Sequence, residues 1–190
     1  QQPGIDLTES FAALAWPSWR WGAVGLTLRQ FGVTGIERRD ERNVLIDGGL
    51  SDAETEAAAG YGRKFSDAWT AGVLVKLRRQ SLAGLAATGI GLDVGLTGQP
   101  AAALGARAAW MQGLTLGLAL ANAVEPAIRL DRDNVPDPTA VRAGASYRCE
   151  VAGGRLLLAA VDLERARGSA TQVHAGLELR VAPLLALRSG

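Results

Sequence analysis

The side chains best suited to catalysis are few, and the single histidine is the first of them. His174 lies two residues after Gln172 and four before Glu178, in a segment of alternating polar and apolar residues. A nucleophilic triad needs a histidine oriented beside a serine, and Ser146, in another such segment, is the one candidate. A histidine that is hydrogen-bonded to neighbouring polar groups is the stronger explanation. We expect no catalytic residue and no enzymatic activity.

Two further patterns resemble ligand-binding loops. Residues 131–137 read DRDNVPD, and acids at such alternate spacing can converge on a calcium ion. An arginine stands among these acids, and the glycine and distal glutamate of an EF-hand are absent, so a hydrated loop is the favoured interpretation. The glycines at 89, 91 and 95 lack the spacing and the following helix of a dinucleotide site. We predict no metal site and no cofactor.

Composition excludes several classes of protein. The formal net charge of +1 over 190 residues gives no basic field for a nucleic-acid partner. No run of about 18 uncharged apolar residues offers a membrane-spanning helix. Glycine supplies 24 of the 190 residues, well above its average usage of roughly 7%. This glycine content disfavours long helices. The single cysteine, Cys149, forms no intramolecular disulfide and falls on the apolar side of its segment. If this chain enters a membrane, it does so with strands.

Apolar residues at every second position indicate β-strands. Residues 113–122 read GLTLGLALAN, and an extended backbone places their four leucines on one side. Residues 89–96 and 71–78 repeat this pattern. Residues 38–51 and 125–138 are expected to be longer connections, and 101–110 a short helix or an edge strand. Ten strands are predicted, at 9–16, 21–31, 54–63, 71–78, 89–96, 113–122, 139–149, 155–164, 171–181 and 184–189.

The second side of these segments distinguishes two kinds of β protein. In a soluble sandwich, the side away from the core would be polar along its whole length, whereas here glycine and alanine dominate it. Small side chains leave room inside a narrow barrel, and larger apolar ones can face hydrocarbon outside. The sequence therefore predicts an all-β fold, an antiparallel membrane β-barrel in a single domain over residues 1–190. A soluble sandwich or lipocalin-like barrel is the alternative.

Charged side chains of such a barrel should face its interior, because a charge in hydrocarbon is costly unless it is paired or hydrated. They either line a path for a solute or form ion pairs that fill the lumen. The predicted lumen-lining residues are Lys76, Arg78, Asp93, Arg142, Arg148, Asp162, Glu164, His174, Glu178 and Arg180. The predicted lipid-facing residues are Val73, Val75, Leu92, Val94, Leu114, Leu116, Leu118 and Leu177.

The five tryptophans lie near predicted strand ends. Outer-membrane barrels carry aromatic girdles at such positions, although tryptophans can also be ordinary core residues. The five tryptophans are Trp16, Trp19, Trp21, Trp69 and Trp110.

Several segments, taken in order, resemble one family of outer-membrane barrels. They are Tyr61–Lys76, a strand, polar turn and strand that ends in lysine; Leu114–Asn122, a glycine-leucine strand closed by asparagine; and Pro138–Tyr147, His174–Glu178 and Leu187–Gly190. The match, from about Phe11 onward, is to the PorV-like shuttle proteins of type IX secretion, which are related to the FadL fatty-acid transporters. The resemblance implies a barrel of about fourteen strands with an N-terminal plug. About ten strands are readable here, so we expect a shortened relative or a part that is incomplete at both ends.

The resemblance also implies a location and partners. It predicts a protein of the bacterial outer membrane that acts in secretion-associated shuttling or in the passage of small or apolar molecules. Membrane lipid or lipopolysaccharide and other envelope proteins would be its partners, with no nucleic acid. A scaffold subunit with a closed lumen, and a soluble lipid-binding barrel, are the alternatives.

Overall fold

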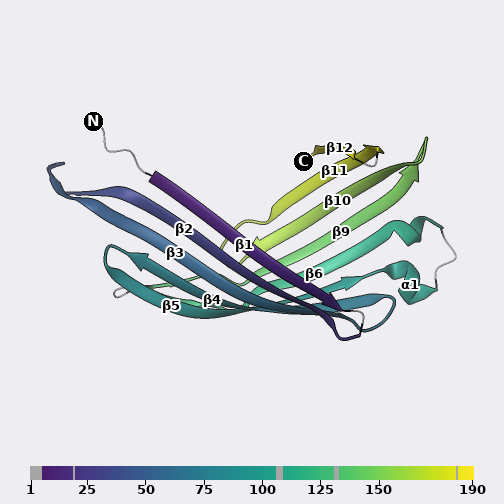
Figure 1. The fold of residues 1–190 in the computed structure, drawn as a ribbon, viewed down its shortest axis with the longest axis horizontal. Helices are drawn as coiled ribbons and strands as arrows, with labels where there is room; N and C mark the ends of the chain where they lie inside the picture. The colour runs from purple at the N-terminus through teal and green to yellow at the C-terminus, as the bar shows by residue number, and fades with distance from the viewer. Residues whose placement is uncertain (1–5, 19, 106–108, 131–132, 183) are drawn as a thin grey trace. The chain divides into compact units, whose positions relative to one another are not determined.

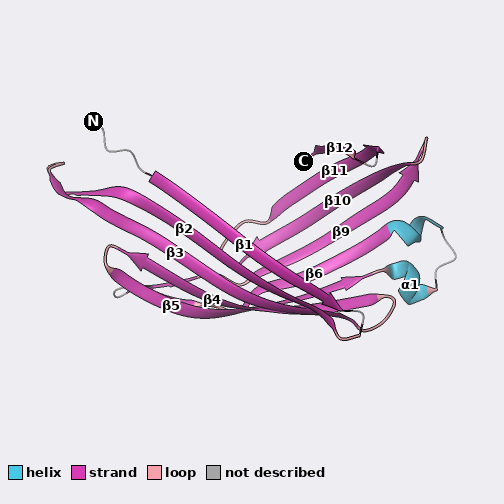
Figure 2. Cartoon of the chain, viewed as in Figure 1, coloured by secondary structure: helices cyan, strands magenta, loops and turns pink. Residues whose placement is uncertain are grey.

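The chain folds as one large antiparallel β-sheet (Figures 1 and 2). The computed structural model describes residues 6–18, 20–105, 109–130, 133–182 and 184–190. Ten strands pair in the order β1-β2-β3-β4-β5-β6-β9-β10-β11-β12, and β7 and β8 form a separate pair. The strands are β1 Asp6–Ser18, β2 Gly22–Arg39, β3 Leu45–Lys64, β4 Trp69–Leu82, β5 Leu85–Gly98, β6 Leu114–Val124, β7 Ala127–Leu130, β8 Asp133–Pro136, β9 Ala140–Val151, β10 Arg155–Ala166, β11 Gln172–Ala182 and β12 Leu185–Ser189.

The all-β, antiparallel prediction is confirmed, and each of the ten predicted segments overlaps one strand of the large sheet. The sheet is not closed as a barrel. Among the described residues, β1 pairs only with β2, and β12 pairs only with β11.

The prediction of a long connection over residues 38–51 is wrong. β2 ends at Arg39 and β3 begins at Leu45, so the connection is short. The Asp40 carboxylate accepts hydrogen bonds from the backbone N–H groups of Arg42, at 2.9 Å, and Val44, at 2.8 Å. Asn43 has a φ of 61°, a left-handed conformation that asparagine tolerates well. The polar residues that suggested a loop instead close a tight turn between two long strands.

Two short helical segments lie between β5 and β6. The helix α1 spans Pro100–Leu104, and the 3-10 helix η1 spans Ala109–Gly113. Proline is favoured in the first turn, and Gly105 ends α1 with a left-handed φ of 57°. This outcome agrees with the helical alternative for residues 101–110. Within the described part of the chain, no helix is both long and apolar enough to cross a membrane.

Contacts group the chain into two compact units. The first unit comprises residues 1–61, 74–92 and 124–137, and the second comprises residues 62–73, 93–123 and 138–190. Very little apolar side chain is buried. Among the described residues, the buried hydrophobic positions are Ala58, Ala68 and Ala140, and the fully buried larger side chain is Pro126. The large apolar side chains therefore lie mostly on the surface.

Candidate functional site

In the second unit, the register of the strands gathers charged side chains on one side of the sheet. Arg142 pairs with Glu164, and Asp162 pairs with His174. Residues at alternate positions share a side, so the whole set follows from these pairs. We name this side the polar face. The predicted lumen residues that lie on it are Arg142, Arg148, Asp162, Glu164, His174, Glu178 and Arg180.

The opposite side of the same strands is apolar, and we name it the apolar face. One row across it runs from Leu116 through Ala145 and Val161 to Ala175, and the neighbouring row contains Leu118 and Leu163. Leu118 is 54% exposed and Leu177 is 55% exposed. The predicted lipid-facing residues Leu114, Leu116, Leu118 and Leu177 all lie on this face.

Strand β5 follows the same alternation. A Cβ added at Gly95 would lie 4.0 Å from the Cβ of Ala119, which is on the polar face. Val94, the neighbour of Gly95, therefore points to the other side, and it is 37% exposed. By the same alternation, Leu92 points away from the side of Asp93. On β4, Val73 and Val75 are exposed, and they alternate with the buried Lys76.

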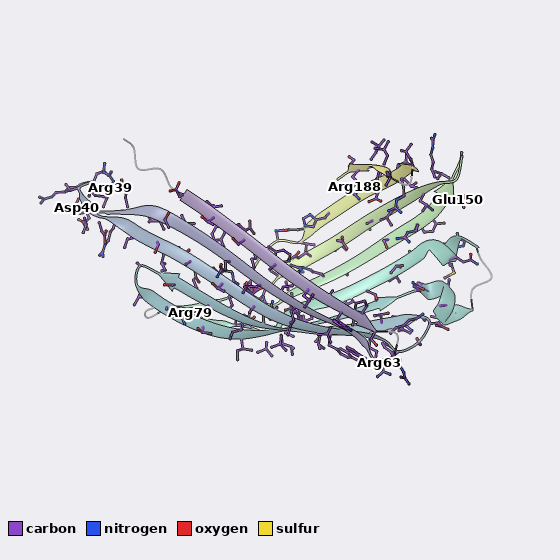
Figure 3. All side chains as sticks on the ribbon, viewed as in Figure 1. Arg39, Asp40, Arg63, Arg79, Glu150 and Arg188 are labelled. Atoms are coloured by element: carbon purple, nitrogen blue, oxygen red, sulfur yellow. The ribbon has the colours of Figure 1, made fainter. Side chains whose placement is uncertain are left out.

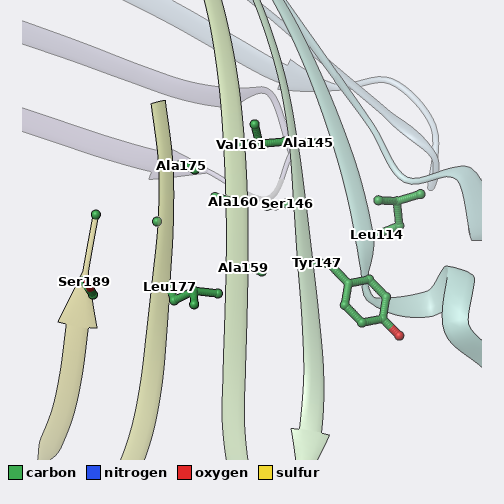
Figure 4. Close-up of a pocket in the computed structure, with 12 residues that line it drawn as sticks. Leu114, Ala145, Ser146, Tyr147, Ala159, Ala160, Val161, Ala175, Leu177 and Ser189 are labelled. Carbon is green, nitrogen blue, oxygen red and sulfur yellow. The ribbon is translucent and has the colours of Figure 1, made fainter. Parts of the chain in front are cut away.

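A hollow marks the apolar face where its side chains are smallest (Figure 4). Its volume is about 420 Å³, and alanines of β9, β10 and β11 form its floor. Leu114, Tyr147 and Leu177 are the larger side chains around it. The hollow offers apolar contact and few polar groups, which suits a hydrocarbon chain more than a polar solute.

In the first unit, Arg78 joins two carboxylates. Its guanidinium lies 2.6 Å from Glu54 on β3 and 2.6 Å from Asp137, which follows β8. All three side chains are largely shielded, with exposed fractions of 24%, 23% and 35%. A guanidinium that donates to two carboxylates forms strong, directional hydrogen bonds. It fastens the segment after β6 to the same side of the sheet as Lys76 and Arg78.

Pro126 fixes the same segment at a second point. A Cβ at Gly89 would lie 2.9 Å from the Cβ of Pro126, and one at Gly91 would lie 2.9 Å from its Cγ and 3.2 Å from the Cε of Lys76. Real Cβ atoms do not approach so closely, so only glycine at these two positions lets Pro126 lie against β5. Residues 124–126 thus cover part of the side that carries Lys76.

In the second unit, Asn122 ends the regular part of β6. It is buried, with a φ of 52°, and its backbone N–H donates to the Asp93 carboxylate at 2.7 Å. Its side-chain amide donates to the carbonyl of Pro138 at 3.3 Å, and its carbonyl accepts from the Thr139 hydroxyl at 2.9 Å. The side-chain bond to Pro138 and the left-handed φ, which asparagine tolerates well, explain the asparagine that closes the glycine-leucine strand.

Ion pairs link the strands across the polar face of the second unit. Arg142 lies 3.0 Å from Glu164. Glu178 accepts from Arg188 of β12 at 2.7 Å and lies 3.7 Å from Arg180. These groups are partly exposed, so each pair contributes little stability by itself, about 0–1 kcal/mol.

The geometry around His174 is that of a cross-strand pair. His174 on β11 is opposite Asp162 on β10, whereas Ser146 lies on β9 opposite Ala160, one strand further away. Within the described residues, no group of three His, Cys, Asp or Glu side chains could hold a metal ion. Residues 131 and 132 of the considered calcium loop lie outside the described residues, and Asp137 is bound to Arg78.

The sequence reasoning missed the partners of the charged residues. Glu54 and Asp137 neutralise Arg78, and Pro126 is the most deeply buried larger side chain among those described. Asp52, also on β3, has a buried carboxylate oxygen with no hydrogen-bond partner in the described part of the chain. The alternation over residues 52–58 could have placed Asp52 and Glu54 on the same side as Ala58. Nothing in the sequence indicated that residues 124–137 fold back onto β4 and β5.

The fold defines a class: an all-β chain with one ten-stranded antiparallel sheet, in which β9, β10 and β11 are apolar on one side and carry charges on the other. No protein-family model matches the chain, and no curated protein matches its sequence. Membership of the PorV-like family therefore stays a prediction.

Proposed function

We propose that the strands of this chain form the wall of a β-barrel in the bacterial outer membrane, with the apolar face against lipid. The carrying observation is that Leu116, Leu118 and Leu177 are exposed in continuous cross-strand rows, while the charges lie on the opposite face. Exposing one such side chain to water costs about 1.5–3 kcal/mol relative to an apolar environment. A hydrocarbon phase removes that cost for the whole face.

The tryptophans support this proposal. Trp16 lies near the end of β1, Trp21 lies in the β1–β2 connection, Trp69 begins β4, and Trp110 lies in η1 before β6. Within the second unit, the β3–β4 and β5–β6 connections lie at the same end of their antiparallel strands. These four side chains are 40–66% exposed, which is typical of an interfacial girdle and unlike a core. Trp19 lies outside the described residues.

Strand lengths also support it. A tilted strand needs about 9–11 residues to cross the hydrocarbon core. Strands β6, β9, β10 and β11 have 11 or 12 residues, whereas β2 has 18 and β3 has 20. We propose that β2 and β3 extend into water at the turn that carries Arg39 and Asp40 (Figure 3).

As its role, we propose the non-enzymatic passage of small or apolar molecules, or secretion-associated shuttling, as in PorV/FadL-type proteins. The polar face would line the interior, and lipid or lipopolysaccharide acyl chains would cover the apolar face and its hollow. A scaffold subunit with an occluded interior is the second candidate. It is favoured by Pro126 and by the Arg78–Asp137 pair, which fix a segment over part of the interior side in the first unit.

Reconstitution into lipid vesicles tests this proposal. We expect the purified protein to require detergent, to float with vesicles after an alkaline wash, and to release a small entrapped sugar faster than protein-free vesicles do. Flotation without release would favour the scaffold over passage. A protein that stays soluble without detergent and does not float would refute the membrane proposal.

A further inference from the structure

A second cavity, which shares Ser146 and Tyr147 with the apolar hollow, lies in the second unit where η1 approaches β9. Its volume is about 500 Å³, within the range of small-molecule sites. Polar side chains surround it, from the residue before α1, from η1 and from the polar faces of β6 and β9. They are Gln99, Gln112, Thr115, Ser146, Arg148 and Glu150.

Gly113 brings the two walls of this cavity together. A Cβ at position 113 would overlap the carbonyl oxygen of Arg148 and lie 3.0 Å from its carbonyl carbon and 3.2 Å from the ring of Tyr147. These are backbone and ring atoms that cannot move aside at low cost. Glycine therefore lets the last residues of η1 lie directly on β9, so that Gln112 and Arg148 line one space.

Arg148 is the cation of this cavity, and its charge is available. The neighbouring polar-face arginines are engaged, since Arg142 pairs with Glu164 and Arg188 pairs with Glu178. The Arg148 side chain is exposed and makes no hydrogen bond or ion pair with another described residue, and its charge acts on Glu178 only through space. A guanidinium offers a planar set of N–H donors that matches the oxygens of a carboxylate or a phosphate.

The other lining groups limit the kind of anion. Amides and hydroxyls, from Gln99, Gln112, Thr115 and Ser146, can hydrogen-bond to an oxyanion or to hydroxyl groups beside it. Glu150, two residues beyond Arg148 near the end of β9 (Figure 3), would repel a second negative group. The lining therefore favours a molecule with one compact anionic group and a hydroxylated remainder.

We propose that this cavity binds a small hydroxylated oxyanion, a carboxylate or a phosphate monoester, through the Arg148 guanidinium. The proposal does not depend on the chain lying in a membrane. It concerns one unit, whose cavity is complete without a lipid phase, so failure of the vesicle experiment would leave it standing.

Calorimetric titration of the detergent-solubilised protein with gluconate and with glycerol 3-phosphate tests this site. We expect both to bind and glycerol not to bind. Arg148→Gln should weaken binding at least about tenfold, the loss of one charged hydrogen-bonded contact. Arg142→Gln, on the same strand and face but away from the cavity, is the matched control and should bind as the unaltered protein does. Glu150→Gln should tighten binding, because it removes the like charge.

Three results would overturn the proposal. They are absence of binding by both anions, equal binding by the Arg148→Gln variant, and equal weakening in the Arg142→Gln variant. Circular dichroism of each variant, compared with that of the unaltered protein, separates loss of the site from loss of the fold.

Discussion

Replacing Leu118 with arginine is expected to lower the free energy of unfolding in lipid vesicles by about 2–4 kcal/mol, the cost of arginine on the lipid side near the bilayer centre. Leu118 is 54% exposed on the apolar face, and it pairs with Ala143 of β9. In water the same replacement would be nearly neutral, because an exposed arginine is well hydrated. Urea unfolding in vesicles, followed by tryptophan fluorescence, measures the difference.

The adjacent residue provides the control for this prediction. Gly117 lies on the polar face opposite Gly144, and a Cβ there has no atom within 4 Å. Gly117→Arg should therefore change the free energy of unfolding by much less than Leu118→Arg. Equal effects of the two replacements would show that the apolar face is not in contact with hydrocarbon.

Replacing Gly89 with alanine is expected to destabilise the protein by about 1–3 kcal/mol, the usual cost of overpacking. The new methyl group would lie 2.9 Å from the Cβ of Pro126 and 3.1 Å from its backbone. Pro126 or β5 must then move, which loosens the segment that Arg78 and Asp137 also hold. Urea unfolding of the same preparation measures the change.

Two comparisons make this second prediction specific. Gly117→Ala, where the methyl group meets open space, should be neutral or slightly stabilising. Pro126→Gly removes the opposing ring, so the added cost of Gly89→Ala should largely disappear in that background. An undiminished cost in the double variant would mean that the strain arises elsewhere in β5.

Much of the sheet could be predicted because alternation is a local signal. Leucines at every second position of residues 114–120 fix both the strand and the side on which each residue lies. The turn at residues 40–44 was missed because charged residues within long strands resemble a loop in sequence. Closure was expected but not found, because pairing between the first and last strands is a long-range property that no local pattern encodes.

The sequence could predict on which face of the sheet each candidate residue lies. It could not predict which of these residues contact one another. The alternation of side chains along each strand predicted that Arg142, Asp162 and Glu178 share one side of the sheet, and the pairing of the strands places them on that side. The pairing of Arg78 with Asp137 joins residues 59 positions apart, and it depends on a segment that folds back. The close approach at Gly113 likewise depends on how η1 meets β9. Such contacts are set by tertiary packing, which the spacing of residues does not reveal.

Spin labels along β6 test most directly whether the apolar face meets lipid. Single cysteines at positions 114–121, in a Cys149→Ser background, would carry a nitroxide in vesicle-reconstituted protein, and its collisions with oxygen and with a water-soluble nickel complex would be measured. We expect oxygen access to be high at 114, 116, 118 and 120 and low at 115, 117, 119 and 121. Shielding of the even positions from both reagents, or no alternation along the strand, would refute the proposal of a lipid-facing sheet.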